Sequence, residues 1–270
     1  MCKGMKYITL NNGAPMPMVG LGTWQLRGQA GERAILDALE LGYRLLDTAR
    51  MYENEDIVGS AVKKSGLPRR EVFITTKLFT PSAGYRKAKE DIARSLEALQ
   101  TDYIDLLLIH EPYEAAPEMY LAMEEACAAG LVRAVGLSNF SGEEYLRFLK
   151  HCRVTPAVDQ VESHVYHPQL ALKKLLEEKG TRMQAWASFT EGRRNIFAEP
   201  VLAEAGRRHG KTAAQTALRY LVEQGIPVLP KSAHRERLRE NLDIFDFSLT
   251  DEDRRAIAAL DEGRSLFGWF

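Results

Sequence analysis

The sequence predicts an α/β protein: a (β/α)8 barrel of the TIM type, with an N-terminal β-hairpin and extra helices near the C-terminus. Short apolar segments recur along the 270 residues with starts mostly about 30 residues apart, the length of one βαβ unit. Helical patterns separate them, and such alternation of strands and helices is typical of a parallel sheet. The predicted strands are residues 18–23, 43–49, 72–78, 103–110, 132–139, 156–163, 181–188 and 227–232.

The segments between these strands have the features of helices. Ser141 and Glu144 form a capping box, in which a serine and a glutamate three residues later satisfy the free amides at a helix start. The long interval before the last strand holds two helical patterns, so one helix is an addition to the barrel. Residues 7–10, followed by the turn sequence NNG, predict the hairpin. The clearest amphipathic segments are residues 53–64, 200–208, 212–223 and 250–260.

A doubly wound dinucleotide-binding sheet is the alternative with the same alternation. Its signature is G-x-G-x-x-G between the first strand and the first helix. Gly20 and Gly22 fit this signature, but the third position is Gln25, so the barrel is favoured. The eight βα units use the whole length, and we therefore expect one domain spanning residues 1–270.

The charge balance excludes one class of partner. Lys and Arg number 36 against 37 Asp and Glu, a net charge of −1. A protein that binds nucleic acid without sequence preference needs a strong basic field, so no nucleic-acid partner is expected. A local cationic pocket remains compatible with this sum.

Cysteine usage and the absence of targeting signals indicate a cytoplasmic protein. Cys2, Cys127 and Cys152 form no CxxC pair, which is typical of reduced thiols. The first residues lack the apolar run of a signal peptide, and no segment is long and apolar enough to predict a membrane span. The histidines show no metal-ligand spacing such as HExxH, so no metal is expected.

Polar residues stand at the ends of the predicted strands. Asp47, Lys77 and His110 end the second, third and fourth strands. One such residue alone is more often solvated than catalytic. Three on consecutive strands indicate a functional rim, because ligands bind at the carboxyl ends of barrel strands. The other polar or aromatic residues at these ends are Ser138, Asn139, Gln160, Glu162, Trp186, Lys231 and Ser232.

Several long motifs resemble the aldo-keto reductase family. They occur in the family's order along nearly the whole chain. They are GLGTW (20–24), LLDTARMYENEDIVG (45–59), FITTKL (73–78), YIDLLLIH (103–110), GLSNF (136–140), PAVDQVESH (156–164) and LPKSAHRERLRENLDIFDFSLTDED (229–253). The family folds as a (β/α)8 barrel and binds NADPH without a Rossmann domain, and its members are often monomers, so we expect the same here.

The resemblance implies a catalytic group of Asp47, Tyr52, Lys77 and His110. Reducing a carbonyl leaves an alkoxide that needs a proton, and Tyr52 would supply it. Lys77 would favour the phenolate and lower the Tyr52 pKa, while Asp47 would keep Lys77 charged. His110 would hydrogen-bond and orient the carbonyl oxygen. In isolation, Tyr52 would also fit an ordinary tyrosine at a helix start.

The resemblance also implies a cofactor site. Ser138, Asn139 and Gln160 match positions that hold the nicotinamide carboxamide, and Trp186 matches the aromatic residue that stacks on its ring. A packed tryptophan at a strand end is the alternative for Trp186. Lys231, Ser232 and Arg237 match the residues that bind the 2′-phosphate, which implies a preference for NADPH over NADH. Glu240 and Asn241 match the contacts to adenine. Arg235 alone fits a residue on a basic surface helix. The remaining implied cofactor contacts are Gly22, Thr23, Trp24, Asp47, Ala187 and Phe189.

The chain departs from the family where substrates bind. Glu111 replaces a pocket tryptophan or glutamine; it would suit polar substrates if it faces the pocket, and it equally fits a position in solvent. Phe79 replaces a pocket tryptophan, and Ala187-Ser188 stands where the bacterial subgroup that reduces diketo sugar acids and small dicarbonyls has Gly-Pro. The implied substrate contacts are Trp24, Tyr52, Phe79, His110 and Glu111.

The C-terminus is shorter than in related chains, which continue over the pocket. Phe267, Trp269 and Phe270 either replace that lid, or they pack against the barrel wall or hang free, and we expect one of the last two.

These observations predict an NADPH-dependent reductase of small polar aldehydes and ketones, with a small carbonyl compound as its partner and Tyr52 as general acid. The alternatives are a nucleotide-binding regulatory or sensor protein of the same fold with weak or no turnover, and a barrel enzyme that uses no nicotinamide.

Overall fold

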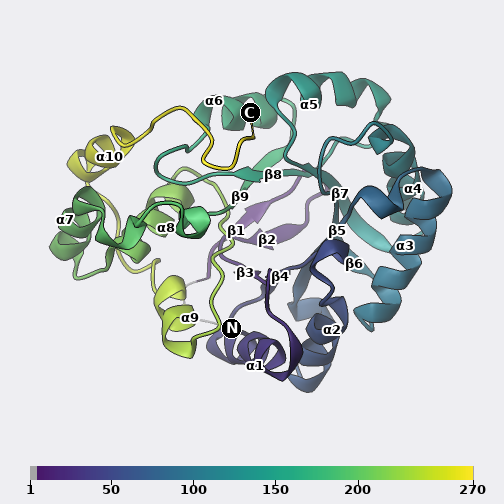
Figure 1. Cartoon of the computed structure of the whole chain (residues 1–270), viewed down its shortest axis with the longest axis horizontal. Coiled ribbons are helices and arrows are strands. Elements are labelled where there is room, and N and C mark those ends of the chain that lie inside the picture. Colours follow the sequence, from purple (N-terminus) through teal and green to yellow (C-terminus); the bar gives the residue numbers. More distant parts are fainter. Residues whose placement is uncertain (1–4, 270) are drawn as a thin grey trace.

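Parallel strands curl into a ring at the centre of the molecule, and helices pack around the outside (Figure 1). The structure is a computed structural model that describes residues 5–269. In its seven-stranded sheet the strands follow the chain order, β3-β4-β5-β6-β7-β8-β9, as repeated βαβ units require. Their bounds are β3 (Leu21–Gly22), β4 (Leu45–Asp47), β5 (Phe73–Leu78), β6 (Ile104–Ile109), β7 (Val132–Ser138), β8 (Val158–Glu162) and β9 (Arg182–Trp186).

Single bridges, rather than a regular eighth strand, close the ring. Val228 forms parallel bridges to Val19 and Ala185, at the two edges of the sheet. The predicted eighth strand is therefore in the expected place but is not a ladder, which corrects the sequence prediction. Pro227 and Pro230 lack the amide proton that a ladder needs, so regular hydrogen bonding cannot continue along this segment.

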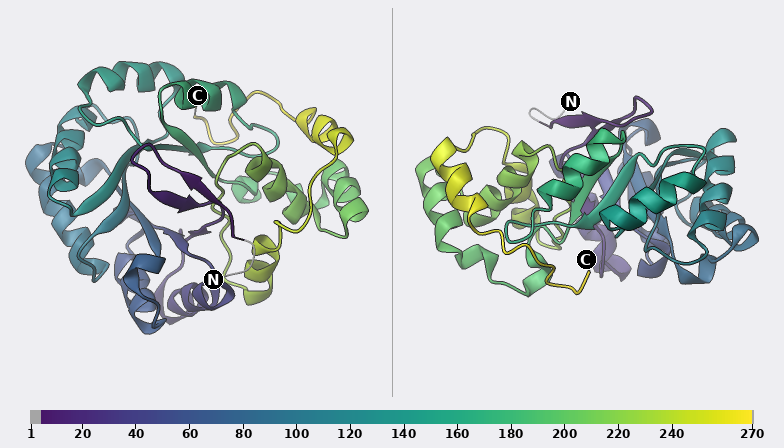
Figure 2. Two further views of the ribbon diagram at one scale, coloured as in Figure 1. Left: turned by 180° about the vertical axis from the view of Figure 1, so that it is seen from behind. Right: turned by 90° about the horizontal axis from the view of Figure 1, so that it is seen from above.

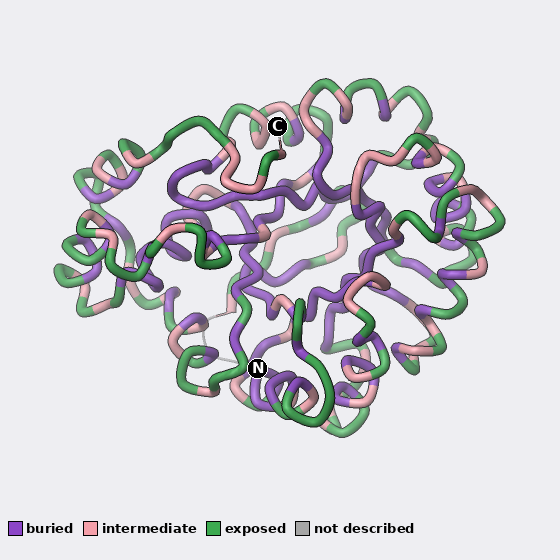
Figure 3. The backbone as a smooth tube through the Cα atoms, viewed as in Figure 1, coloured by how far each residue is buried: buried purple, intermediate pink, exposed green. Residues whose placement is uncertain are grey.

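A hairpin covers one end of the ring, as the sequence predicts. β1 (Tyr7–Thr9) and β2 (Pro15–Pro17) pair antiparallel and lie across the barrel (Figure 2). The Asn12 amide donates a hydrogen bond of 2.9 Å to the Arg133 carbonyl at the start of β7, so this is the amino end of the strands. The strands of the ring are mostly buried (Figure 3). Buried apolar side chains, two of them from residues 10–17, form one cluster here. They are Leu10, Met16, Leu45, Phe73, Leu106, Leu108, Ala134, Ala157, Val158 and Leu229.

The helices occupy the intervals that the sequence predicts. The capping box of Ser141 and Glu144 is present at the start of α5. Within residues 5–269, every helix is too short or too polar to cross a bilayer. The bounds are α1 (Gly28–Leu41), α2 (Glu55–Lys64), α3 (Tyr85–Ala98), α4 (Ala116–Ala128), α5 (Gly142–Phe148), α6 (Leu170–Glu178), α7 (Pro200–His209), α8 (Ala213–Glu223), α9 (Arg235–Leu242) and α10 (Asp251–Ala258).

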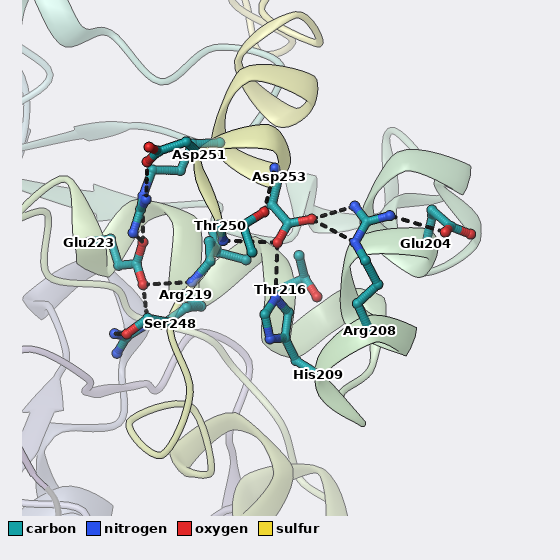
Figure 4. Close-up of polar contacts among 12 residues, drawn as sticks. Glu204, Arg208, His209, Thr216, Arg219, Glu223, Ser248, Thr250, Asp251 and Asp253 are labelled. Atoms are coloured by element: carbon teal, nitrogen blue, oxygen red, sulfur yellow. Dashed lines mark hydrogen bonds and ion pairs between the residues drawn. The ribbon is translucent and has the colours of Figure 1, made fainter.

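Polar side chains join α7, α8 and α10 (Figure 4). The buried carboxylate of Asp253 lies 2.9 Å from His209 Nε2 and forms an ion pair with Arg208. Glu223 on α8 lies 3.0 Å from an Arg254 guanidinium nitrogen. Burial alone would raise the pKa of Asp253, but the hydrogen bonds from His209 and Arg208 outweigh it and hold that pKa well below its ordinary value. Helices α7 and α8 are thus each fixed to α10 by ion pairs.

Candidate active site

Asp47 and Lys77 meet at the carboxyl end of the barrel because β4 and β5 are neighbours. Lys77 Nζ lies 2.6 Å from Asp47 Oδ1 and 3.1 Å from the Thr48 carbonyl oxygen. Both side chains are almost fully buried. Burial alone would lower the pKa of Lys77, but the Asp47 carboxylate more than compensates, so this pKa lies above its ordinary value. Lys77 is therefore an ammonium ion held in one place.

Tyr52 lies in the loop after β4, at the end of the 3-10 turn Arg50–Tyr52. Its hydroxyl accepts a hydrogen bond of 3.3 Å from Lys77 Nζ. Burial raises the pKa of Tyr52, Lys77 lowers it and Asp47 raises it, and the result lies above the ordinary value. The direction of the Lys77 effect is the one expected from the sequence, but the expected net lowering is wrong, because burial outweighs the ammonium. Tyr52 is therefore a neutral phenol at pH 7.

Two aromatic rings flank Tyr52. The His110 ring lies 5.8 Å away, centre to centre, at 72°, and the Trp24 ring lies 4.9 Å away. Burial and the neighbouring Lys77 lower the pKa of His110 to about 3, so its imidazole is neutral. Its Nδ1 is buried and has no hydrogen-bond partner among residues 5–269. The site thus presents a neutral phenol beside a neutral imidazole.

A chain of amide groups connects this site to β7, β8 and β9. Gln160 Nε2 donates to Asp47 Oδ2 at 2.7 Å. Asn139 Nδ2 donates to the His110 carbonyl at 3.0 Å, and Asn139 Oδ1 accepts from Trp186 Nε1 at 2.8 Å. The Ser138 hydroxyl donates to the Gln160 carbonyl at 2.8 Å. These contacts fix the amides and the indole ring relative to the Asp47–Lys77 pair.

Four residues of this group, Trp24, Asp47, Tyr52 and Trp186, border a cleft of about 300 Å³. Ser188 is buried beside it, and its hydroxyl has no hydrogen-bond partner within the described residues. Glu191 also lines the cleft, a residue that the sequence analysis missed; its place in the loop after β9 was the available signal. The lining residues are Gly22, Thr23, Trp24, Gln25, Asp47, Tyr52, Trp186, Ala187, Ser188, Phe189, Glu191, Leu229, Pro230 and Lys231.

The predicted phosphate and adenine contacts follow one another along the chain from Lys231 to α9. Lys231 is exposed and lines the cleft, and Arg237 is exposed on α9; neither has an ion-pair partner in the part of the chain that the structure describes. The Ser232 hydroxyl accepts a hydrogen bond of 3.0 Å from the His234 amide. Glu240 is half-buried and Asn241 is buried.

Arg235 has a different role from these residues. Its guanidinium lies 2.6 Å from Asp37 and 2.7 Å from Glu40, so it joins α9 to α1. Arg235 therefore acts as a residue of a surface helix, as the sequence analysis allowed.

Three predicted substrate contacts, Phe79, His110 and Glu111, are not part of the cleft lining. Phe79 lines a separate surface pocket with Met51 and Pro81. Glu111 is half-buried beside His110. Burial and the Glu111 carboxylate raise the pKa of Tyr113 to about 12, which places that carboxylate near Tyr113. The structure thus brings Trp24, Tyr52 and His110 together and leaves Phe79 outside the group.

The thiols and the acidic residues form no metal site in the described part of the chain. No group of three or more His, Cys, Asp or Glu side chains there could hold an ion. Cys127 and Cys152 are free thiols. Cys2 and Phe270 lie outside the described residues.

Comparison with known proteins shows which family has this sequence and this fold. The model of the Aldo/keto reductase family matches residues 18–262. The 2,5-diketo-D-gluconic acid reductase B of Corynebacterium sp. (strain SHS752001) is 41% identical over 260 residues, covering 95% of this chain and 94% of that protein.

Solved structures agree in fold. MGS-M4, an aldo-keto reductase from a Medee basin deep-sea metagenome library, superposes with a TM-score of 0.95 at 38% identity, covering 97% of this chain and 98% of that one. A Bombyx mori aldo-keto reductase in complex with NADP superposes with a TM-score of 0.90 at 29% identity, covering 97% and 94%. The family model spans most of the sequence, and the barrel is the one expected. The chain therefore belongs to the aldo/keto reductase family.

Proposed function

We propose that this protein reduces small polar aldehydes and ketones with NADPH, and that Tyr52 is the general acid. The observation that carries this proposal is the position of Lys77, whose single Nζ contacts both the Asp47 carboxylate and the Tyr52 hydroxyl beside the cleft. A buried ammonium shared by a carboxylate and a phenol is costly for folding unless it is used.

The residues around the cleft fit a nicotinamide dinucleotide phosphate. The buried Ser188 hydroxyl offers a hydrogen bond that the described residues do not use. A Cβ at Gly22 would meet the Leu229 carbonyl oxygen at 2.9 Å, so a larger residue there would crowd the cleft. Lys231 and Arg237 provide positive charge for a phosphate that carries nearly two negative charges. The relative from Bombyx mori, which was solved with NADP, supports the same cofactor.

Bound NADPH supplies a hydride to the carbonyl carbon. The residues of this chain act on the oxygen. His110, as a neutral imidazole, donates a hydrogen bond that orients the carbonyl and stabilises developing negative charge. Tyr52 transfers its hydroxyl proton to the resulting alkoxide, and Lys77 stabilises the phenolate left behind. Asp47 keeps Lys77 charged.

The size and charge of the cleft indicate the substrate class. A volume of about 300 Å³ lies at the lower end of the range for small-molecule sites. Lys231 and Glu191 at its border, and the half-buried Glu111 next to His110, favour hydroxylated or dicarbonyl compounds over large apolar ones. The relative that reduces a diketo sugar acid supports this class.

Single-turnover oxidation of bound NADPH tests the proposal. The protein is loaded with NADPH and mixed in a stopped-flow instrument with a panel of small dicarbonyls and apolar aldehydes. We expect a fast loss of the NADPH absorbance with the polar dicarbonyls. Tight binding without any oxidation would instead support a sensor, and no binding would support a barrel enzyme that uses no nicotinamide.

A further inference from the structure

A buried carboxylate at the end of β8 anchors the C-terminal segment of the chain. Glu162 is 1% exposed. Its Oε1 accepts hydrogen bonds from His164 Nε2 at 3.0 Å and from the Leu266 amide at 2.8 Å, and its Oε2 accepts one from the Ser265 hydroxyl. Donors to a carboxylate are charge-assisted and about twice as strong as neutral ones. The segment is therefore fixed to the barrel at a definite point, 103 residues away in the sequence.

The same serine organises the residues that follow it. Ser265 Oγ accepts hydrogen bonds of 3.0 Å from the amides of Phe267 and Trp269. One hydroxyl thus donates a hydrogen bond to Glu162 and accepts hydrogen bonds from two backbone amides. These bonds curl residues 265–269 over the end of β8. We refer to residues 262–269 as the C-terminal clasp. In Figure 1 the clasp runs in yellow from α10 back toward α6 and β8, and Figure 2 shows its end on the opposite side of the barrel from the hairpin.

The clasp places the ring of Phe267 against Trp186. The two ring centres lie 5.0 Å apart at an angle of 69°, an edge-to-face contact. The guanidinium carbon of Arg193 lies 4.4 Å from the centre of the Phe267 ring, and Arg194 forms an ion pair with Glu262. The clasp therefore holds both Trp186 and the loop that carries Glu191. Phe267 packs, as expected, but its contact is a residue of the cleft rather than a plain part of the barrel wall.

Trp186 transmits this contact to the centre of the site. Its indole nitrogen donates to Asn139 Oδ1 at 2.8 Å, and the Asn139 amide donates to the His110 carbonyl at 3.0 Å. Phe267 is not among the described residues that line the cleft, whereas Trp186 is. A side chain that contacts Trp186 from outside the cleft can therefore change the orientation of the indole ring without contacting a substrate.

We propose that the C-terminal clasp is a positioning device for the nicotinamide ring: Glu162 anchors it, and Phe267 fixes the tilt of Trp186 against that ring. This inference rests on the proposed function, which places the ring on Trp186. Glu162, Ser265 and Phe267 are positioning residues in this scheme, because they act through Trp186. The clasp sets the affinity for the cofactor and the rate of hydride transfer, and it leaves the affinity for the carbonyl substrate unchanged.

Variants of the full-length protein test the clasp. Phe267→Ala removes the ring, Ser265→Ala releases the turn from Glu162, and Phe267→Tyr keeps the edge-to-face contact. Tyr7→Ala, an exposed aromatic truncation on the hairpin at the far end of the barrel, is the matched control. For each variant we would measure the NADP⁺ dissociation constant by calorimetry, the KM for a dicarbonyl at saturating NADPH, the single-turnover rate and the thermal unfolding midpoint.

We expect Phe267→Ala and Ser265→Ala to weaken NADP⁺ binding about fivefold, since an aromatic edge-to-face pair contributes about 1 kcal/mol. The single-turnover rates of these two variants should fall, while their KM for the carbonyl substrate stays near the wild-type value. Phe267→Tyr and Tyr7→Ala should match the wild type in NADP⁺ affinity and in single-turnover rate.

Two results would overturn the clasp. One is an unchanged NADP⁺ affinity with a raised carbonyl KM, which would make residues 262–269 a cover over the substrate. The other is a loss of thermal stability with both binding constants unchanged, which would make the contact simple packing. A wild-type protein that binds no NADP⁺ would contradict the proposed function itself, and the wild-type titration shows this separately.

Discussion

Lys77 Nζ lies 3.3 Å from the Tyr52 hydroxyl oxygen, and burial nevertheless keeps the Tyr52 pKa above its ordinary value. A general acid is active in its protonated form, so a raised pKa leaves Tyr52 ready to donate at neutral pH. The role of Lys77 is then to limit the rise and to stabilise the phenolate after the proton has left.

This arrangement predicts a flat pH profile for carbonyl reduction. His110, with a pKa of about 3, stays neutral over the whole working range. Tyr52 stays protonated until the pH passes the ordinary phenol value of about 10. We therefore expect kcat/KM for reduction to be constant from about pH 5 to 9 and to fall only at higher pH. Steady-state kinetics in overlapping buffers check this, and a break near pH 6.5 would instead show that an exposed histidine controls the step.

Glu191 places a carboxylate at the border of the cleft, where a cofactor phosphate would also lie. Its charge raises the Tyr52 pKa and disfavours a second negative charge nearby. Glu191→Gln is therefore expected to tighten NADP⁺ binding by about threefold, within the range for a partly exposed charge pair. Calorimetry measures the effect, and Glu118→Gln, an exposed glutamate on α4, is the matched control. Weaker binding in the Glu191 variant would show that its carboxylate contacts the cofactor favourably.

Lys231 and Arg237 have no ion-pair partner within residues 5–269, and they are the two cations that we assign to the 2′-phosphate. Replacing either with alanine should weaken NADP⁺ binding by about tenfold, since a charge-assisted contact to phosphate contributes about 1.5–3 kcal/mol. Binding of NAD⁺, which lacks that phosphate, should change little. Parallel titrations with the two cofactors decide the matter, and equal losses for both would place the phosphate elsewhere.

Asp253 should control the stability of the C-terminal helices. Asp253→Ala leaves Arg208 and His209 without their buried partner, and we expect the free energy of unfolding to fall by about 3 kcal/mol at pH 7. Because the pKa of Asp253 is lower in the folded state than in the unfolded chain, its contribution is complete above the unfolded value and is lost as the pH falls through the folded one.

The difference in the free energy of unfolding between the wild type and Asp253→Ala should therefore become smaller in acid. Urea denaturation across the acid range measures it. Asp251→Ala, which removes an exposed carboxylate from the same helix, is the control and should change stability little. A gap that stays constant down to the lowest pH at which the protein folds would argue against an ionised Asp253.

The sequence was sufficient for the barrel and for the group at its rim, for one physical reason. Parallel strands carry their last residues to the same edge, so Asp47, Lys77 and His110 come together once their strands are recognised. The apolar pattern of residues 227–232 predicts a regular eighth strand, but Pro227 and Pro230 lack the amide protons that such a strand needs, so only single bridges form.

Contacts between distant segments were beyond the reach of periodicity and motifs. Glu162 and Ser265 contact each other across 103 residues, and neither lies in a pattern that predicts the other. The net shift of the Tyr52 pKa depends on how deeply the surrounding loops bury the phenol, which spacing alone does not reveal. Phe79 falls outside the cleft for a related reason, because the direction of a loop side chain depends on the packing of that loop.

The most direct test of Tyr52 as the general acid is the pair of measurements on Tyr52→Phe: NADP⁺ affinity by calorimetry and carbonyl reduction under saturating NADPH. The variant keeps the ring between Trp24 and His110 and removes only the hydroxyl that Lys77 contacts. We predict that binding stays within about twofold of the wild type while kcat falls by about a thousandfold, the scale of a lost general acid. Turnover close to the wild-type rate, with the cofactor bound normally, would contradict the assignment.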